Sequence, residues 1–207
     1  MDEIFSSFLA QWQQQSLLEI AAVLFSMLYP WLAARQNILC WPAALLSTSL
    51  YAYVFWESNL PFNSVLNVYY LVMAVYGWVR WSKDDSGKTL AVSTLPLIYH
   101  IVAVPVLLIS GFTLSHLVTF SWAGTDLYLD AMVTVFSVYA TFLMANKVLE
   151  NWLFWIVING FACYLYFTNG LFLTGVLFIG YFIFAFYGYC HWKRDYKTQG
   201  APEQQLV

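Results

Sequence analysis

Charged residues are scarce in this chain, making up only 9% of its 207 residues. A water-soluble domain carries roughly 25% charged residues, because its surface must stay hydrated. The chain is instead 61% hydrophobic and 20% aromatic. This composition excludes an ordinary soluble globule and predicts an all-α integral membrane protein.

Several kinds of chemistry also lack the residues they need. The three cysteines, Cys40, Cys163 and Cys190, are isolated, so neither a disulfide framework nor a metal site is expected. The three histidines are scattered, and the chain has no glycine-rich loop ending in Gly-Lys-Ser or Gly-Lys-Thr that would hold a nucleotide phosphate. The net charge of −3 suggests no nucleic-acid partner. We therefore expect no enzyme activity, no cofactor and no bound metal.

What the chain does contain is a series of apolar runs, each close to the roughly 20 residues that cross a bilayer as a helix. A polar stretch, Ser86–Ser93, separates the third run from the fourth. Helices are expected at Leu17–Ala33, Ile38–Trp56, Asn63–Trp81, Leu95–Phe112, Leu127–Ala145, Glu150–Phe167 and Leu171–Trp192.

Two parts of the chain are related by a constant offset. The segment Leu18–Trp81 can be laid on Leu129–Trp192 without a gap, 111 residues apart, and both segments end on Tyr-Gly-x-x-x-Trp. Such duplication is typical of transporters whose substrate site lies between the repeats. We expect seven transmembrane helices in a 3+1+3 order. The units are an N-terminal segment 1–16, a first three-helix repeat 17–82, a cytoplasmic loop 83–94, a connecting helix 95–112, a second three-helix repeat 127–192 and a tail 193–207.

Basic residues are confined to alternate loops, since all eight follow odd-numbered helices. They are Arg35, Arg80, Lys83, Lys88, Lys147, Lys193, Arg194 and Lys197. Short loops rich in Lys and Arg stay in the cytoplasm, so the N-terminus is expected outside and the C-terminus inside. With three helices per repeat and one connector, the two repeats are then parallel.

Polar and aromatic side chains within the spans are candidates to line a cavity, because a bilayer makes polar groups costly. They form stripes at helical spacing on three of the expected helices. The second carries Trp41, Ser47, Thr48 and Tyr51, the third carries Asn63, Asn67 and Tyr70, and the sixth carries Trp152, Trp155, Asn159 and Tyr166. The alternative is structural, since Trp and Tyr anchor membrane interfaces and interhelical Asn or Ser often only join helices. Trp78, Trp81 and Trp192 fit such an interface belt better than a site.

Acidic residues mark the expected outer side. Glu19 and Asp130 are equivalent under the repeat offset and start their helices, while Glu57 ends the second helix. Together they suggest an acidic mouth that attracts cations. The alternative is stabilisation of a carboxylate by the helix N-terminal charge. A cavity of amides, hydroxyls and aromatic faces, without Lys or Arg, suits a neutral or cationic aromatic ligand.

Two runs resemble a known family. They are Glu150-Asn151-Trp152-Leu153-Phe154-Trp155-Ile156-Val157-Ile158-Asn159 and Tyr76-Gly77-Trp78-Val79-Arg80-Trp81, which are similar to signatures of the PnuC family of bacterial vitamin transporters. The resemblance implies a 3+1+3 arrangement with a parallel pseudo-twofold axis, and a homotrimer in the inner membrane. It also implies facilitated diffusion of an unphosphorylated vitamin, which a cytosolic kinase then traps. Trp152, Trp155 and Asn159 match the binding run of the family.

The substrate expected from this resemblance depends on two departures from the nicotinamide riboside pattern. Asn67 stands where a Gln is usual, and Ser47 stands near the place of an Asn. A ribose with several hydroxyls needs such partners. We therefore expect a thiamine-type branch of the family, with nicotinamide riboside as the alternative and riboflavin after it. The remaining alternative is a membrane subunit that transports nothing.

Overall fold

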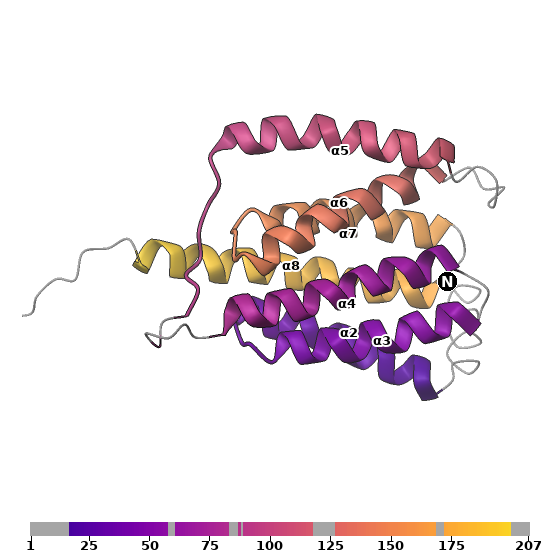
Figure 1. Cartoon of the computed structure of the whole chain (residues 1–207), viewed down its shortest axis with the longest axis horizontal. Helices are drawn as coiled ribbons and strands as arrows, with labels where there is room; N and C mark the ends of the chain where they lie inside the picture. The colour runs from indigo at the N-terminus through magenta and orange to yellow at the C-terminus, as the bar shows by residue number, and fades with distance from the viewer. Residues whose placement is uncertain are drawn as a thin grey trace, which may run out of the picture.

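The computed structural model describes residues 17–57, 61–82, 87, 89–117, 127–168 and 172–199, and Figure 1 shows the whole chain. Helices account for nearly all of this described part. They are α2 (Leu17–Ala34), α3 (Cys40–Glu57), α4 (Pro61–Trp81), α5 (Leu97–Leu117), α6 (Leu127–Ala145), α7 (Asn151–Thr168) and α8 (Phe172–Gln199).

The helix bounds follow the apolar runs of the sequence to within a few residues, with two differences. Helix α5 continues to Leu117 and α8 continues to Gln199, beyond the predicted ends at Phe112 and Trp192. The added residues of α8 include Lys193, Arg194 and Lys197. A fall in hydropathy marks where an apolar run stops, but Lys and Arg are good helix formers and the helix runs on through them.

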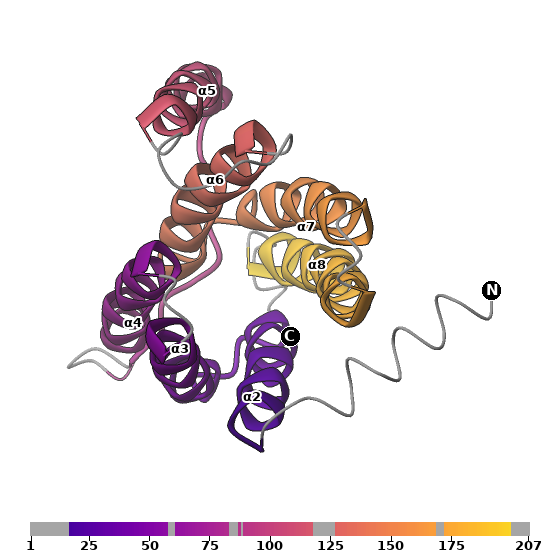
Figure 2. The same ribbon diagram turned by 90° about the vertical axis from the view of Figure 1, so that its right-hand side faces the viewer.

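Six of the helices close into a ring, seen end-on in Figure 2. Helix α2 packs on α3, α3 on α4, α4 on α6, α6 on α7, α7 on α8, and α8 returns to α2. We call α2–α4 the first triplet, α6–α8 the second triplet, and the whole the six-helix ring. Helix α5 stands outside it and packs against α6. Each helix pair in one triplet has its counterpart in the other when 111 residues are added.

The same offset appears in the backbone of the turns that follow α2 and α6. The amide of Gln36 donates to the carbonyl of Ala33 at 2.9 Å, and the amide of Lys147 donates to that of Met144 at 3.0 Å. Both Gln36 and Lys147 have positive φ, 53° and 50°. Two turns 111 residues apart therefore have the same conformation and the same hydrogen bonds.

One short pairing distinguishes the second turn. The amide of Ser93 donates to the carbonyl of Lys147 at 2.9 Å, and the amide of Leu149 donates to the carbonyl of Ser93 at 2.8 Å. The segment 89–96 thus crosses one end of the ring before it leads into α5 (Figure 1). This bridge fixes the connector against the turn between α6 and α7.

The outer surface of the bundle is largely apolar. Leu24, Val72, Val79, Ile109 and Phe161 are each more than half exposed, with many similar neighbours. Two helices within the described residues are long and apolar enough to cross a bilayer by themselves. These are Leu97–Leu117 with mean hydropathy 2.1 and Phe172–Thr198 with 1.7. Contiguous apolar surface of this kind marks a face that meets other apolar matter.

Two glycines allow tryptophans to pack at one end of the ring. A Cβ added to Gly77 would come within 2.3 Å of the Trp41 indole, and one added to Gly188 within 2.6 Å of the Trp152 indole. Both indoles are fully buried. The two contacts are equivalent under the offset, so each triplet places its indole on a glycine in the same way.

We predict that Gly77→Ala and Gly188→Ala each lower the free energy of unfolding by about 1–3 kcal/mol, because the indole beneath must shift in a packed core. Gly160→Ala is the matched control, since its added Cβ would lie 3.7 Å from Phe182, an ordinary contact. Unfolding of the purified protein in detergent, followed by intrinsic tryptophan fluorescence, measures the difference. Equal stability of all three variants would contradict this packing.

Candidate functional site

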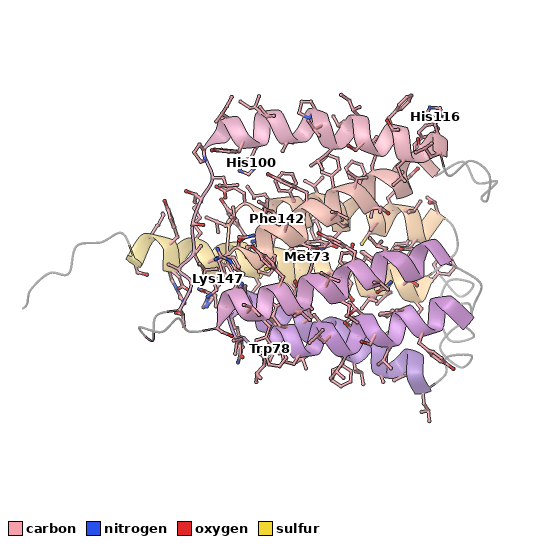
Figure 3. The ribbon with its side chains drawn as sticks, in the orientation of Figure 1. Met73, Trp78, His100, His116, Phe142 and Lys147 are labelled. Carbon is pink, nitrogen blue, oxygen red and sulfur yellow. The ribbon has the colours of Figure 1, made fainter. Side chains whose placement is uncertain are left out.

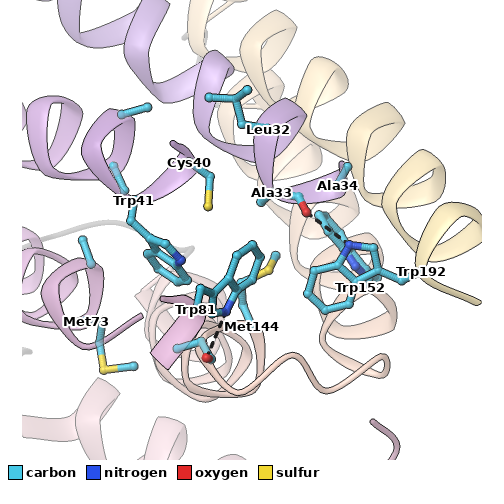
Figure 4. Packing of buried hydrophobic residues seen from close by; sticks show 14 of the residues in the cluster. Leu32, Ala33, Ala34, Cys40, Trp41, Met73, Trp81, Met144, Trp152 and Trp192 are labelled. Atoms are coloured by element: carbon cyan, nitrogen blue, oxygen red, sulfur yellow. Dashed lines mark hydrogen bonds between the residues drawn. The ribbon is translucent and has the colours of Figure 1, made fainter. Parts of the chain in front are cut away.

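Four tryptophans form a row that closes one end of the six-helix ring. Trp41 meets Trp81 edge to face at 5.2 Å between centroids, Trp81 meets Trp192 at 5.8 Å, and Trp192 meets Trp152 edge to face at 5.4 Å (Figure 4). We call these four residues the tryptophan row. The offset exchanges its two outer and its two inner members, so the row is symmetric about its centre.

The inner pair ties the triplets together through hydrogen bonds. Trp81 Nε1 donates to the carbonyl of Ala145 on α6 at 3.1 Å, and Trp192 Nε1 donates to the carbonyl of Ala33 on α2 at 3.1 Å (Figure 4). Both indoles are buried. The expected interface position therefore fits the exposed Trp78, but not Trp81 or Trp192.

The three tryptophans proposed as ligand partners differ from this inner pair. Trp41 and Trp152 are the outer members of the row, and Trp155 is partly buried beside them on α7. Among the described residues, the indole N–H groups of these three have no hydrogen-bond partner. Their rings are held by packing, and their N–H groups are buried donors that only a ligand entering the packed interior could reach.

Pairs of hydroxyl groups join the two triplets away from the tryptophan row. Tyr70 on α4 makes a side-chain hydrogen bond with Ser137 on α6, and Tyr181 on α8 makes one with Ser26 on α2. These two pairs are equivalent under the offset, and each crosses a seam where one triplet meets the other. Both tyrosines also lie near Tyr166 on α7.

Amides and further aromatic rings come from the same helices. Asn67 on α4 is 9% exposed, and Asn159 on α7 is 3% exposed. The ring of Tyr166 lies 4.9 Å from that of Phe178, which in turn lies 5.2 Å from Tyr181. The second triplet thus carries a continuous aromatic surface from Tyr166 to Tyr181.

The hydroxyls predicted on α3 are directed to their own helix. Ser47 Oγ donates to the carbonyl of Ala44 at 3.1 Å, and Thr48 Oγ1 donates to the same carbonyl at 2.7 Å. Their hydroxyl hydrogens are therefore already used. Tyr51, one turn further, lies near Tyr181 of the other triplet.

Four of the predicted side chains cannot be placed. Asn63, Glu19, Glu57 and Asp130 have side chains outside the described part of the structure. The acidic mouth therefore stays a prediction. Within the described residues, no group of three His, Cys, Asp or Glu side chains is arranged to hold a metal ion.

A cavity of about 590 Å³ lies away from these residues, on the outside of the ring. It is an open groove between α5 and α6, lined by Ile98, Tyr99, Val102, Ala103, Val106 and Tyr139. Its aliphatic walls offer few hydrogen-bonding groups, and a polar vitamin needs several. We therefore place the candidate site inside the ring rather than in this groove.

Of the seam residues, Tyr70 was predicted from sequence, whereas Ser26, Ser137 and Tyr181 were not, although the repeat contains the signal that identifies them. Under the offset, Ser26 coincides with Ser137 and Tyr70 with Tyr181. Identical polar residues at equivalent positions of two mostly different segments are good candidates for the surface that the repeats share. A second missed set, Gln36, Lys147 and Asp195, lies at the end closed by the tryptophan row.

Comparison with known proteins places this geometry in a family. The family model described as nicotinamide mononucleotide transporter matches residues 16–194. The nicotinamide riboside transporter PnuC of Escherichia coli is 21% identical over 212 residues, covering 90% of this chain and 89% of that protein. The PnuC of Haemophilus influenzae is 28% identical over 151 residues, covering 70% and 65%.

A solved structure shares the fold. The crystal structure of the vitamin B3 transporter PnuC superposes with a TM-score of 0.71 and 23% sequence identity, covering 94% of this chain and 90% of that one. The relatives are named as transporters and not as enzymes, in agreement with the expectation of no enzyme activity. The chain belongs to the PnuC family, whose model carries the description nicotinamide mononucleotide transporter.

Proposed function

We propose that this protein lets nicotinamide riboside cross the bacterial inner membrane by facilitated diffusion. The observation that carries the proposal is a ring of six helices whose equivalent seams pair tyrosines with serines, and whose helices α4 and α7 each bury an amide, in a chain related throughout to nicotinamide riboside transporters. Its apolar outer surface suits a bilayer. The 3+1+3 order, the parallel repeats and an outside N-terminus belong to the same proposal.

The chemistry of the site favours a riboside over a mononucleotide. A phosphate group needs Arg, Lys or a helix N-terminus as a partner. The described basic side chains lie in the C-terminal parts of α4 and α8 or directly after α2 and α6, so they gather at one end of the ring, which we call the basic end. They are Arg35, Arg80, Lys147, Lys193, Arg194 and Lys197. The amides and tyrosines of the site suit the hydroxyls and the cationic pyridinium ring of the riboside instead.

Nicotinamide riboside also replaces thiamine as the favoured vitamin. The argument for thiamine rested on Ser47 and Asn67, and the Ser47 hydroxyl is directed to its own helix. A position whose side chain serves its own backbone says little about the ligand. The relatives are named for nicotinamide riboside, which supports that choice. Thiamine and riboflavin remain the comparison ligands for experiment.

The candidate residues divide into roles by position. We assign Asn67 and Asn159, one from each triplet, to the polar edge of the ligand, and Trp155 and Tyr166 to its ring faces. Trp41 and Trp152 contribute through their N–H donors at the floor of the site, where their rings are fixed by packing. Because the triplets meet at two seams, rocking one against the other would expose the site to each side in turn. A homotrimer, and trapping of the vitamin by a cytosolic kinase, complete the proposal.

We predict that Asn159→Ala and Asn67→Ala each weaken nicotinamide riboside binding by roughly tenfold to a hundredfold, since each leaves a polar ligand group without its partner. Trp155→Ala should weaken binding by a smaller factor, through the loss of one aromatic face. Quenching of intrinsic tryptophan fluorescence during titration of the purified protein measures the affinity.

The ligands compared in this titration are nicotinamide riboside, nicotinamide mononucleotide, thiamine and riboflavin. Asn37→Ser is a suitable control, because Asn37 lies outside the ring interior and its side chain caps the start of α3 by accepting from the Leu39 amide at 2.9 Å. Unchanged affinity in both amide variants would remove the site assignment. Tighter binding of thiamine than of nicotinamide riboside would favour thiamine as the substrate, as the sequence predicted.

We also predict that Tyr70→Phe and Tyr181→Phe each destabilise the protein by about 0.5–1.5 kcal/mol, the usual worth of one hydrogen bond. Because both bonds cross a seam, the variants should also change the rate of uptake into proteoliposomes. Tyr164→Phe, at an exposed position on α7, is the control. A loss of stability in the control as large as that in the seam variants would rule out this role.

A further inference from the structure

Lys147 is a buried cation at an unusual place in the ring. It follows α6, is 4% exposed, and has a positive φ of 50°. Its Nζ donates to Oε1 of Gln36 at 3.1 Å, a residue 111 positions earlier in the chain. The two residues are therefore repeat equivalents in direct contact, so the pseudo-twofold axis of the ring passes close to the lysine ammonium.

A second contact between equivalent residues lies beside the first. Trp81 and Trp192, the inner pair of the tryptophan row, are also related by the offset. The Lys147 ammonium lies 4.6 Å from the centre of the Trp81 ring. The axis therefore passes an indole pair, labelled in Figure 4, and a cation, labelled in Figure 3, at the same end of the bundle.

The nearby negative charge does not reach this ammonium directly. Gln36 Nε2 donates to Oδ2 of Asp195 at 2.7 Å, so the carboxamide stands between the cation and the carboxylate. Asp195 also pairs with Nε2 of His191 at 3.7 Å. Within the described residues, no carboxylate oxygen lies within 4.0 Å of Lys147 Nζ. Burial lowers the pKa of Lys147, while Cys40 and Asp195 act in the opposite direction.

The side chains of Lys147, Gln36 and Asp195 come from both triplets. Lys147 and Asp195 are both in the second triplet or its adjoining turn, whereas Gln36 follows α2 of the first. Separation of the triplets at this end would withdraw Gln36 from between them. Lys147 and Asp195 would then be free to pair, which cancels the charge on the axis.

We propose that Lys147 is the residue that keeps small cations from leaking through this carrier, a role that rests on the proposed function. With the end closed, its uncancelled charge on the axis repels protons and alkali cations, as a fixed Arg does in other selective pores. With the end open, the Lys147–Asp195 pair is neutral, and the cationic riboside passes it. Gln36 is the positioning residue that separates the pair in the closed form.

Proteoliposomes with an internal pH-sensitive dye and an imposed potassium diffusion potential test this role. Lys147→Gln should raise proton leak by about tenfold or more, because a unit charge near the path is removed from a medium of low dielectric. The variant is expected to fold, since Gln36 already occupies the equivalent turn with the same backbone conformation. Lys193→Gln, an exposed lysine at the same end, is the matched control and should leak like the unaltered protein.

Exchange of the two side chains gives a second, independent measurement. The double variant Gln36→Lys with Lys147→Gln restores one ammonium on the axis. Its leak should return to that of the unaltered protein. Asp195→Asn should leave the leak low and slow riboside uptake by about tenfold, because the opened end then carries an unpaired cation.

Leak and uptake are measured in the same vesicles. A Lys147→Gln protein whose proton leak equals that of the unaltered protein would overturn the role of Lys147, whatever the uptake shows. Absence of riboside uptake by the unaltered protein would instead remove the proposed function, while the leak comparison would still report on the lysine.

Discussion

The architecture depends on two indole N–H groups that donate hydrogen bonds to carbonyls at helix ends in an apolar environment. The last carbonyls of a helix have no partner within the helix, and in an apolar medium each unpaired group is costly. Trp81 reaches the carbonyl of Ala145 at the end of α6, and Trp192 reaches that of Ala33 at the end of α2. Each triplet thus completes the other, and neither has this interaction by itself. The remaining features of the basic end, from the glycine contacts to the aligned turns, lie around these two bonds.

The two ends of the ring also differ in the contacts that join the triplets. The tryptophan row fills the axis near the basic end, and its rings contact each other edge to face, the favourable geometry for aromatic pairs. Beyond it the two seams are joined by hydroxyl groups, Tyr70 with Ser137 and Tyr181 with Ser26. The proposed rocking of the triplets requires such a division, because they would have to move against each other while staying in contact.

The helices and their repeat were accessible from sequence, because apolar run length and a constant offset both leave traces in the residues themselves. The neighbours that the side chains of each polar and aromatic stripe contact were harder to predict from sequence. Spacing places Trp152 and Asn159 on one face of α7, but it does not say that Trp152 meets Trp192 while Asn159 lies buried further along. The Ser47 hydroxyl illustrates the same limit, since only coordinates show that it bonds to Ala44. Buried Lys147 was assigned to a cytoplasmic loop, because a positive charge in a short loop predicts exposure to water and not contact with a glutamine 111 residues away.

The backbone at Gln36 and Lys147 adopts a conformation that is unfavourable for both residues. A left-handed conformation is natural for glycine and costs other residues on the order of 1 kcal/mol. Glycine at either place would relieve that strain and would leave the helix ends equally well closed. Yet both turns carry long polar side chains that meet each other. Both turns thus carry a small backbone strain. The side chains that they hold place a carboxamide oxygen and an ammonium group in contact where the halves of the molecule touch.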